Sequence, residues 1–116
     1  MLYLIDSDER YLLADRVIVC DSFFSRLLGA LPAGGIEEGK ALIFPRTGAI
    51  HTWFMRRPID LLYFGEAGKI IATHSHVKPF RFIYGTSEAR GTVELPSGKI
   101  PERLSPTSRL ILPTYQ

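Results

Sequence analysis

The chain has 116 residues, of which 46% are hydrophobic and 22% charged, and its formal net charge is +2. This length and composition predict one domain over residues 1–116 with a single hydrophobic core. The low net charge, the lack of long Lys/Arg runs and the lack of any stretch near the roughly 18 apolar residues of a membrane span exclude the usual patterns of nucleic-acid binding and membrane insertion. We therefore expect neither nucleic acid nor a membrane as a partner.

Glycine and proline punctuate the chain evenly, with ten glycines and eight prolines. The runs between them are rich in Val, Ile, Leu, Phe and Tyr, which favours short strands separated by turns. The expected strands lie at residues 2–5, 16–20, 41–44, 50–55, 60–64, 69–77, 80–84, 90–95 and 108–112. This spacing predicts a mainly β fold: a compact closed or partly open β-barrel of about six to eight short strands.

One segment, DSFFSRLLG, has a helical pattern. Asp21 or Ser22 suits an N-cap, apolar residues follow at helical spacing, and Gly29 suits the C-terminal end. We expect a short helix over residues 22–28 on the outside of the barrel. The glycine-rich stretch that follows it predicts a loop over residues 29–40, long enough to be functional.

The start of the chain and its cysteine content bear on the compartment. MLYLIDSDER has only a short apolar start, with no cation ahead of it and no small-residue cleavage site, and so it lacks the pattern of a secretory signal. Cys20 is the single cysteine, which excludes an intramolecular disulfide and suits a reducing compartment. We expect a cytoplasmic protein.

HTWFMRRPIDLLYF, residues 51–64, places an aspartate inside an apolar run. Pro58 cannot donate a ladder hydrogen bond, so a strand is expected to begin at Asp60. An ionised carboxylate among apolar neighbours costs several kcal/mol unless it is paired or bonded to backbone amides. We interpret Asp60 as a structural carboxylate satisfied by Arg56, Arg57 or backbone N–H groups, with a general base as the alternative.

The residues just before Pro58 also allow both a structural and a functional interpretation. His51, Trp53 and Met55 lie on one face of the expected strand over residues 50–55, and the other face is also largely apolar. This favours a central strand buried on both sides, with His51 near its more solvent-exposed end. The alternative places His51 and Trp53 at the rim of a pocket.

Four cations flank two proline breaks, at Pro58 and Pro79. If the two breaks lie at one barrel mouth, the cations converge there and could hold a phosphate or a carboxylate, to which arginine makes bidentate contacts. Solvated surface charge is the alternative. The predicted ligand-binding residues are Arg56, Arg57, Lys78, Arg81 and His51.

No recognisable catalytic set is present: G-x-S-x-G, C-x-x-C, H-E-x-x-H and phosphate-binding glycine motifs are all absent. Glu94, like Asp60, is a carboxylate between apolar residues. His74 and His76 lie on one side of a strand and could share a metal, but zinc needs three or four ligands and the other candidates are dispersed. We therefore predict no metal and no cofactor, and the candidate catalytic residues are Asp60, Glu94 and His51.

Taken together, the motifs are similar to those of a known family. The order ADRV, R-x-x-G at Arg26 to Gly29, HTWFMRRPIDLLYF, GKII, VKP and VELPSG resembles the family catalogued as domain of unknown function 192, small uncharacterised proteins of bacteria and archaea. The resemblance extends from about Asp15 to about Leu112. The chain departs from the pattern after Gly29, where it has Ala30 and Leu31 in place of the family's Leu-Met or Leu-Leu.

The resemblance implies a β-barrel-like domain with one outer helix, and it implies no activity. It places six residues at the family's motif positions: Arg26, Gly29, Trp53, Met55, Asp60 and Glu94. Our leading hypothesis is a non-enzymatic or accessory β-barrel that binds a small anionic ligand or a protein partner, with residues 29–40 as a cover. Two alternatives stay open: a hydrolase-type enzyme that uses Asp60 or Glu94 with His51, and a homodimeric interaction module that pairs through an edge strand or apolar patch. Monomer and homodimer are both compatible with the sequence.

Overall fold

Two strands that are buried along their whole length form the centre of the fold: β6 (Ile59–Phe64) and β9 (Gly91–Pro96). They pair antiparallel within a five-stranded sheet of order β3-β4-β9-β6-β7. Successive side chains of a strand point to opposite faces, so burial of every residue means that both faces of this sheet are covered. Apolar runs such as IDLLYF suit this position.

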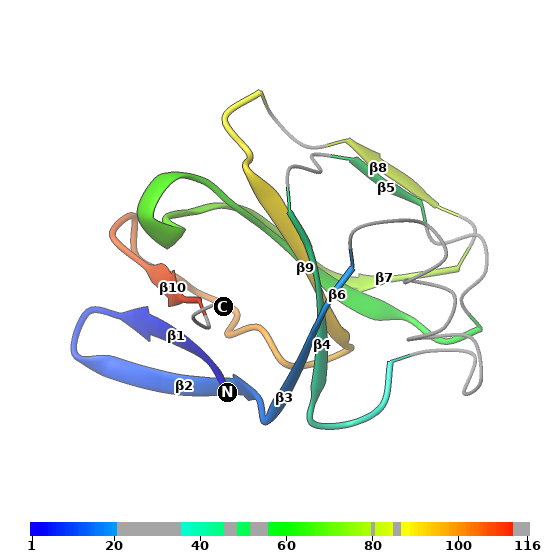
Figure 1. The fold of residues 1–116 in the computed structure, drawn as a ribbon, viewed down its shortest axis with the longest axis horizontal. Helices are drawn as coiled ribbons and strands as arrows, with labels where there is room; N and C mark the ends of the chain where they lie inside the picture. Colours follow the sequence, from blue (N-terminus) through cyan, green and yellow to red (C-terminus); the bar gives the residue numbers. More distant parts are fainter. Residues whose placement is uncertain (21–35, 46–48, 52–55, 80, 85–86, 113–116) are drawn as a thin grey trace.

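The computed structural model describes residues 1–20, 36–45, 49–51, 56–79, 81–84 and 87–112 (Figure 1). The central sheet is completed by β3 (Arg16–Val19), β4 (Lys40–Pro45) and β7 (Ile70–Val77), and β3 alone runs parallel to its neighbour. A second sheet has the order β10-β1-β2, and a third pairs β5 with β8. Their bounds are β1 (Leu2–Asp6), β2 (Glu9–Ala14), β10 (Arg109–Ile111), β5 (Ala49–His51) and β8 (Phe82–Tyr84).

Each face of the central sheet has its own hydrophobic cluster. On one face, Leu62 and Val93 pack with Leu2, Leu4 and the rest of the β10-β1-β2 sheet. On the other, the cluster contains Cys20, Ile36, Leu42, Phe44, Ile59, Leu61 and Val77. The alternation of β6 therefore divides its side chains between two cores, and each fully buried aliphatic side chain contributes about 1.5–3 kcal/mol.

The prediction of a mainly β fold is confirmed, whereas a barrel is not observed. In the described residues the sheets do not close on one another, and β3 and β7 form the edges of the central sheet. The β1-β2 hairpin packs across one face of that sheet as a second layer and does not extend it (Figure 1). The spacing of strands along the chain does not reveal whether a hairpin pairs with the edge of a sheet or packs on its face.

The chain shows little helix where it is described. A 3-10 turn, η2 (Glu66–Gly68), connects β6 to β7, and no helix in the described part of the chain is long and apolar enough to cross a membrane. The helix expected over residues 22–28 lies outside the described residues. So do residues 29–35 of the predicted loop.

Candidate functional site

The side chain of Asp60, the second residue of β6, is completely buried. Its Oδ1 accepts the backbone N–H of His76 at 2.9 Å. Its Oδ2 accepts three consecutive N–H groups, from Gly98 at 3.0 Å, Lys99 at 2.9 Å and Ile100 at 3.1 Å. Four donors satisfy a carboxylate that would otherwise be costly to bury. Both oxygens of Asp60 are therefore bonded to backbone amides, as the structural interpretation requires.

Two local irregularities of the backbone make this arrangement possible. The register of β6 with β7 shifts between Ile59, opposite Val77, and Leu61, opposite His74, so that two residues of β7 oppose one of β6. His76 lies in this bulge with φ of 54°, and its N–H turns to Asp60 and leaves the ladder. Gly98 has φ of +91°, a conformation that other residues rarely adopt. Asp60 thus fixes both the β7 bulge and the turn after β9.

Three segments meet at this end of the central sheet, which we name the Asp60 end: residues 56–58, 76–78 and 97–99. Ile59 pairs with both Val77 and Pro96, so the residues before β6, after β7 and after β9 lie side by side. Arg56, Arg57 and Lys78 are exposed here. The register thus brings three of the four predicted cations to one end of the sheet.

The remaining predicted ligand-binding residues belong to the third sheet. Arg81 is exposed and directly precedes β8, and His51 lies opposite Phe82 where β5 pairs with β8. The backbone of His51 is described and its side chain is not. Trp53, Met55, Arg26 and Gly29 lie outside the described residues.

A small cleft opens at the Asp60 end, with a volume of about 240 Å³. It is lined by Ile36, Glu38, Arg57, Pro58, Pro96 and Ser97. Glu38 is itself paired, with its Oε2 2.6 Å from Nζ of Lys99. The Ser97 hydroxyl bonds to the ring of His76. Arginine thus borders a cleft of a size that suits a phosphate or carboxylate group.

Glu94 lies on the other face of the sheet. It is completely buried, opposite Leu42 on β4 and Leu61 on β6, on the side of the second cluster. Asp60 neighbours Leu61 in the chain and therefore points to the opposite face. The structure does not bring the two candidate carboxylates together.

The charge of Glu94 reaches Tyr63, whose side chain is on the same face. Burial and, to a smaller extent, the negative charge of Glu94 together raise the pKa of Tyr63 to about 12. The Tyr63 hydroxyl donates a hydrogen bond to the carbonyl of Ile83 at 3.0 Å. This bond ties β6 to β8 across the second cluster.

The two histidines of THSH have different surroundings. The ring of His74 meets that of Tyr63 edge-on, with centroids 5.8 Å apart, whereas the ring of His76 bonds to Ser97. Within the described ranges, no group of three or more His, Cys, Asp or Glu side chains could hold a metal ion.

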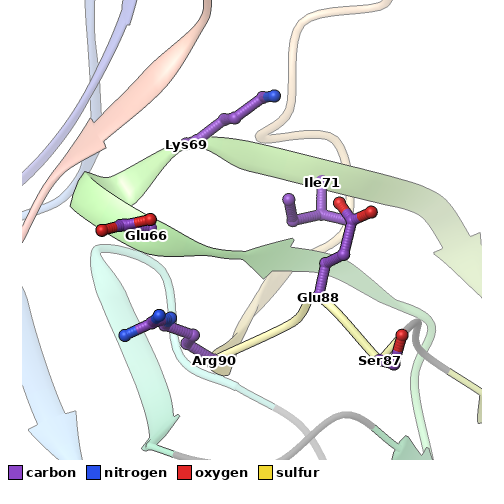
Figure 2. Close-up of a pocket in the computed structure, with 6 residues that line it drawn as sticks. All are labelled: Glu66, Lys69, Ile71, Ser87, Glu88 and Arg90. Carbon is purple, nitrogen blue, oxygen red and sulfur yellow. The ribbon is translucent and has the colours of Figure 1, made fainter.

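A second cleft, of about 380 Å³, lies at the opposite end of β6 (Figure 2). Its lining is formed by Glu66, Lys69, Ile71, Ser87, Glu88 and Arg90. Sequence reasoning missed this cleft, because its residues come from two turns that are distant in the chain and match no motif. The charged residues near the break between the expected strands at 60–64 and 69–77 were the one available signal.

An exposed apolar row crosses the outer face of the β10-β1-β2 sheet. Tyr3 lies opposite both Ile111 and Leu12, and its hydroxyl contacts the sulfur of Met1. Met1, Leu12 and Ile111 are the exposed large hydrophobic residues found in the described part of the chain. The homodimer stays a prediction, and this row is an apolar patch of the kind that such an interface needs, alongside the edge strands.

A comparison of the chain with models of known protein families shows which family it belongs to. The model of DUF192, described as "Uncharacterized ACR", matches residues 4–109. The chain belongs to this family. The resemblance seen in the sequence motifs is thereby confirmed. No curated protein matches the chain.

Two solved structures share the fold of this DUF192 chain. A protein of unknown function from Novosphingobium aromaticivorans DSM 12444 has a TM-score of 0.73 at 11% identity, with 96% of this chain and 83% of that chain covered. A protein from Sinorhizobium meliloti 1021, provisionally described as a transcription regulator, has a TM-score of 0.71 at 20% identity, with coverages of 95% and 90%. At these identities the likeness shows the fold alone.

Removing the Asp60 carboxylate should destabilise the protein strongly. Asp60→Ala leaves four backbone N–H groups without their acceptor, so we expect a loss of at least about 3 kcal/mol in the free energy of unfolding, measured by urea denaturation. Asp8→Ala, at an exposed turn position, is the matched control and should change it by less than about 0.5 kcal/mol. Equal, small effects of the two substitutions would contradict the structural role.

Tyr63 should make stability fall at high pH. The phenol has its ordinary pKa of 10.0 in the unfolded chain and a pKa of about 12 in the folded chain, so the stabilisation is full below pH 10 and is lost as pH rises towards 12. Urea unfolding at pH 9 and pH 11 should show a smaller loss in Tyr63→Phe than in the wild type. Tyr11→Phe, which keeps Tyr63, should retain the wild-type loss. An unchanged loss in Tyr63→Phe would refute the assignment.

Proposed function

We propose that this DUF192 protein is a non-enzymatic binding domain that takes a small anionic ligand, such as a phosphate or carboxylate group, at the Asp60 end. The observation that carries the proposal is the register of Ile59 with Val77 and Pro96, because it gathers Arg56, Arg57 and Lys78 at one end of the sheet. Arginine suits this ligand, since its guanidinium offers two parallel donors to such a group.

Rigidity of the backbone also supports the proposal. The four hydrogen bonds to Asp60 fix the segments that border Arg57 and Lys78, so little ordering is left to occur on binding. The loop that was expected to act as a cover contributes Ile36 and Glu38 to the cleft beside Arg57. The positive charge of Lys99 offsets the negative charge of Glu38, and this reduces the repulsion between Glu38 and a bound anion.

The placement of the carboxylates supports the non-enzymatic part of the proposal. Both oxygens of Asp60 already accept backbone N–H groups, and Glu94 points to the opposite face of the sheet. General acid–base catalysis needs a titratable group within reach of the substrate, with a partner beside it. Neither carboxylate lines the cleft that Arg57 borders.

Calorimetric titration with inorganic phosphate and with succinate, at constant ionic strength, tests the proposal. Arg57→Ala should weaken binding about tenfold or more, because a charge-assisted hydrogen bond contributes roughly 1.5–3 kcal/mol. Arg109→Ala is the matched control. It removes the same charge from β10, which bridges to Lys69 at the far end of β6, and should leave the affinity unchanged.

Two results would overturn the proposal. One is the absence of heat with either anion at concentrations up to about 10 mM, where even weak specific binding is detectable. The other is an equal loss of affinity in Arg57→Ala and Arg109→Ala, which would mean that the anion responds only to net charge.

A further inference from the structure

The cleft at the opposite end of β6 has a charge pattern unlike that of the Asp60 end. Two carboxylates and two cations line it: Glu66, Glu88, Lys69 and Arg90. All four are exposed, and none of them forms an ion pair or a side-chain hydrogen bond with any residue that the structure describes. The cleft thus offers balanced and available charges of both signs.

The side chains lie around an apolar wall. In Figure 2, Glu66 and Arg90 are on the same side of the cleft, Glu88 lies beside Ile71, and Lys69 extends away from them. Arg90 and Glu88 therefore lie apart along the cleft, with Glu88 next to Ile71, which is half-buried. Ser87 adds a hydroxyl that can donate or accept.

Backbone contacts hold the walls of the cleft in place. Arg90 donates its N–H to the carbonyl of Phe64 at 2.8 Å, and Gly65 donates its N–H to the carbonyl of Lys69 at 2.7 Å. A Cβ at Gly65 would lie 2.9 Å from Cδ1 of Ile71, closer than real Cβ atoms approach, and 3.2 Å from the carbonyl oxygen of Glu88, tighter than most such contacts. Glycine at this position lets the two turns approach each other, so the cleft is preformed.

These observations restrict the chemistry of a ligand. A simple anion would meet the carboxylates of Glu66 and Glu88, and a simple cation would meet Lys69 and Arg90. A molecule with one carboxylate and one ammonium group satisfies one protein charge of each sign, and its apolar part can contact Ile71. The volume of about 380 Å³ accommodates an amino acid or a dipeptide.

We propose that the cleft beside η2 binds a zwitterion of the amino acid or dipeptide class, with its carboxylate on Arg90, its ammonium group on Glu88 and its apolar side chain against Ile71. This site is separate from the proposed anion site, because the two clefts lie at opposite ends of β6 and share no lining residue.

Calorimetric titration of the full chain with L-leucine and with leucyl-leucine tests the proposal. Binding of either probe is expected. For the probe that binds, the N-acetyl derivative, which lacks the ammonium group, and the C-terminal amide, which lacks the carboxylate, should each bind at least about tenfold more weakly.

Variants then assign the two ends of the ligand. Arg90→Gln and Glu88→Gln change exposed side chains and should fold normally, which circular dichroism can verify. Arg90→Gln should weaken the parent probe about tenfold and leave the affinity for its amide unchanged, whereas Glu88→Gln should weaken the parent and spare the N-acetyl derivative. Arg10→Gln, on the outer face of the β10-β1-β2 sheet, is the control and should bind like the wild type.

The proposal is overturned if neither leucine nor leucyl-leucine binds at concentrations up to about 10 mM. It is also overturned if the derivatives bind as well as their parents, or if Arg90→Gln and Glu88→Gln leave binding intact. Binding of phosphate or succinate at the Asp60 end has no bearing on these outcomes, so the two sites succeed or fail separately.

Discussion

The carboxylate of Asp60 holds together three segments that the rest of this end of the molecule depends on. This carboxylate belongs to the central strand β6 and accepts a hydrogen bond from His76 in the bulge of β7. It also accepts hydrogen bonds from the turn after β9, donated by Gly98, Lys99 and Ile100. An unpaired charge in this position would cost several kcal/mol, and four backbone donors offset that cost. The same bonds determine where the cations before β6 and after β7 lie. A candidate catalytic acid therefore has both of its carboxylate oxygens bonded to backbone amides.

The division between buried and exposed charge runs through the whole domain. Asp60 and Glu94 are buried on opposite faces of the central sheet, where one organises the backbone and the other adds to the raised pKa of Tyr63. The charges that can meet a ligand lie at the two ends of β6, mostly cationic at one end and balanced at the other. A rigid sheet that presents different charge patterns at its two ends is consistent with the proposed binding.

Much of the fold could be predicted from local pattern. The expected strands at 60–64, 69–77 and 90–95 lie within one residue of β6, β7 and β9, because apolar runs between glycines and prolines indicate strands. β2 was missed because ERYLLA begins with exposed charged residues, and only its last two residues are buried. The segment therefore lacks the apolar run by which the other strands were predicted. The barrel is not confirmed, because turn spacing indicates how many strands form and leaves open which strands pair.

The sites were predicted unevenly for a similar reason. The interpretation of Asp60 as a structural carboxylate needed only the free-energy cost of burying a charge. The position of a carboxylate in an apolar run after a proline was enough to suggest it. The bulge that turns the N–H of His76 towards Asp60 depends on register, which the sequence does not reveal. The cleft beside η2 joins residues 66–71 to residues 87–90, and only the folded chain brings these turns together.

Amide hydrogen exchange, followed by NMR, tests the central claim most directly. If Asp60 organises this end of the sheet, the N–H groups of His76, Gly98, Lys99 and Ile100 should exchange far more slowly in the wild type than in an unstructured peptide. In Asp60→Asn, which keeps the shape and removes the charge, these four amides should lose protection while those at the centre of β9 keep it. Exchange of all four at unprotected rates in the wild type would contradict the account.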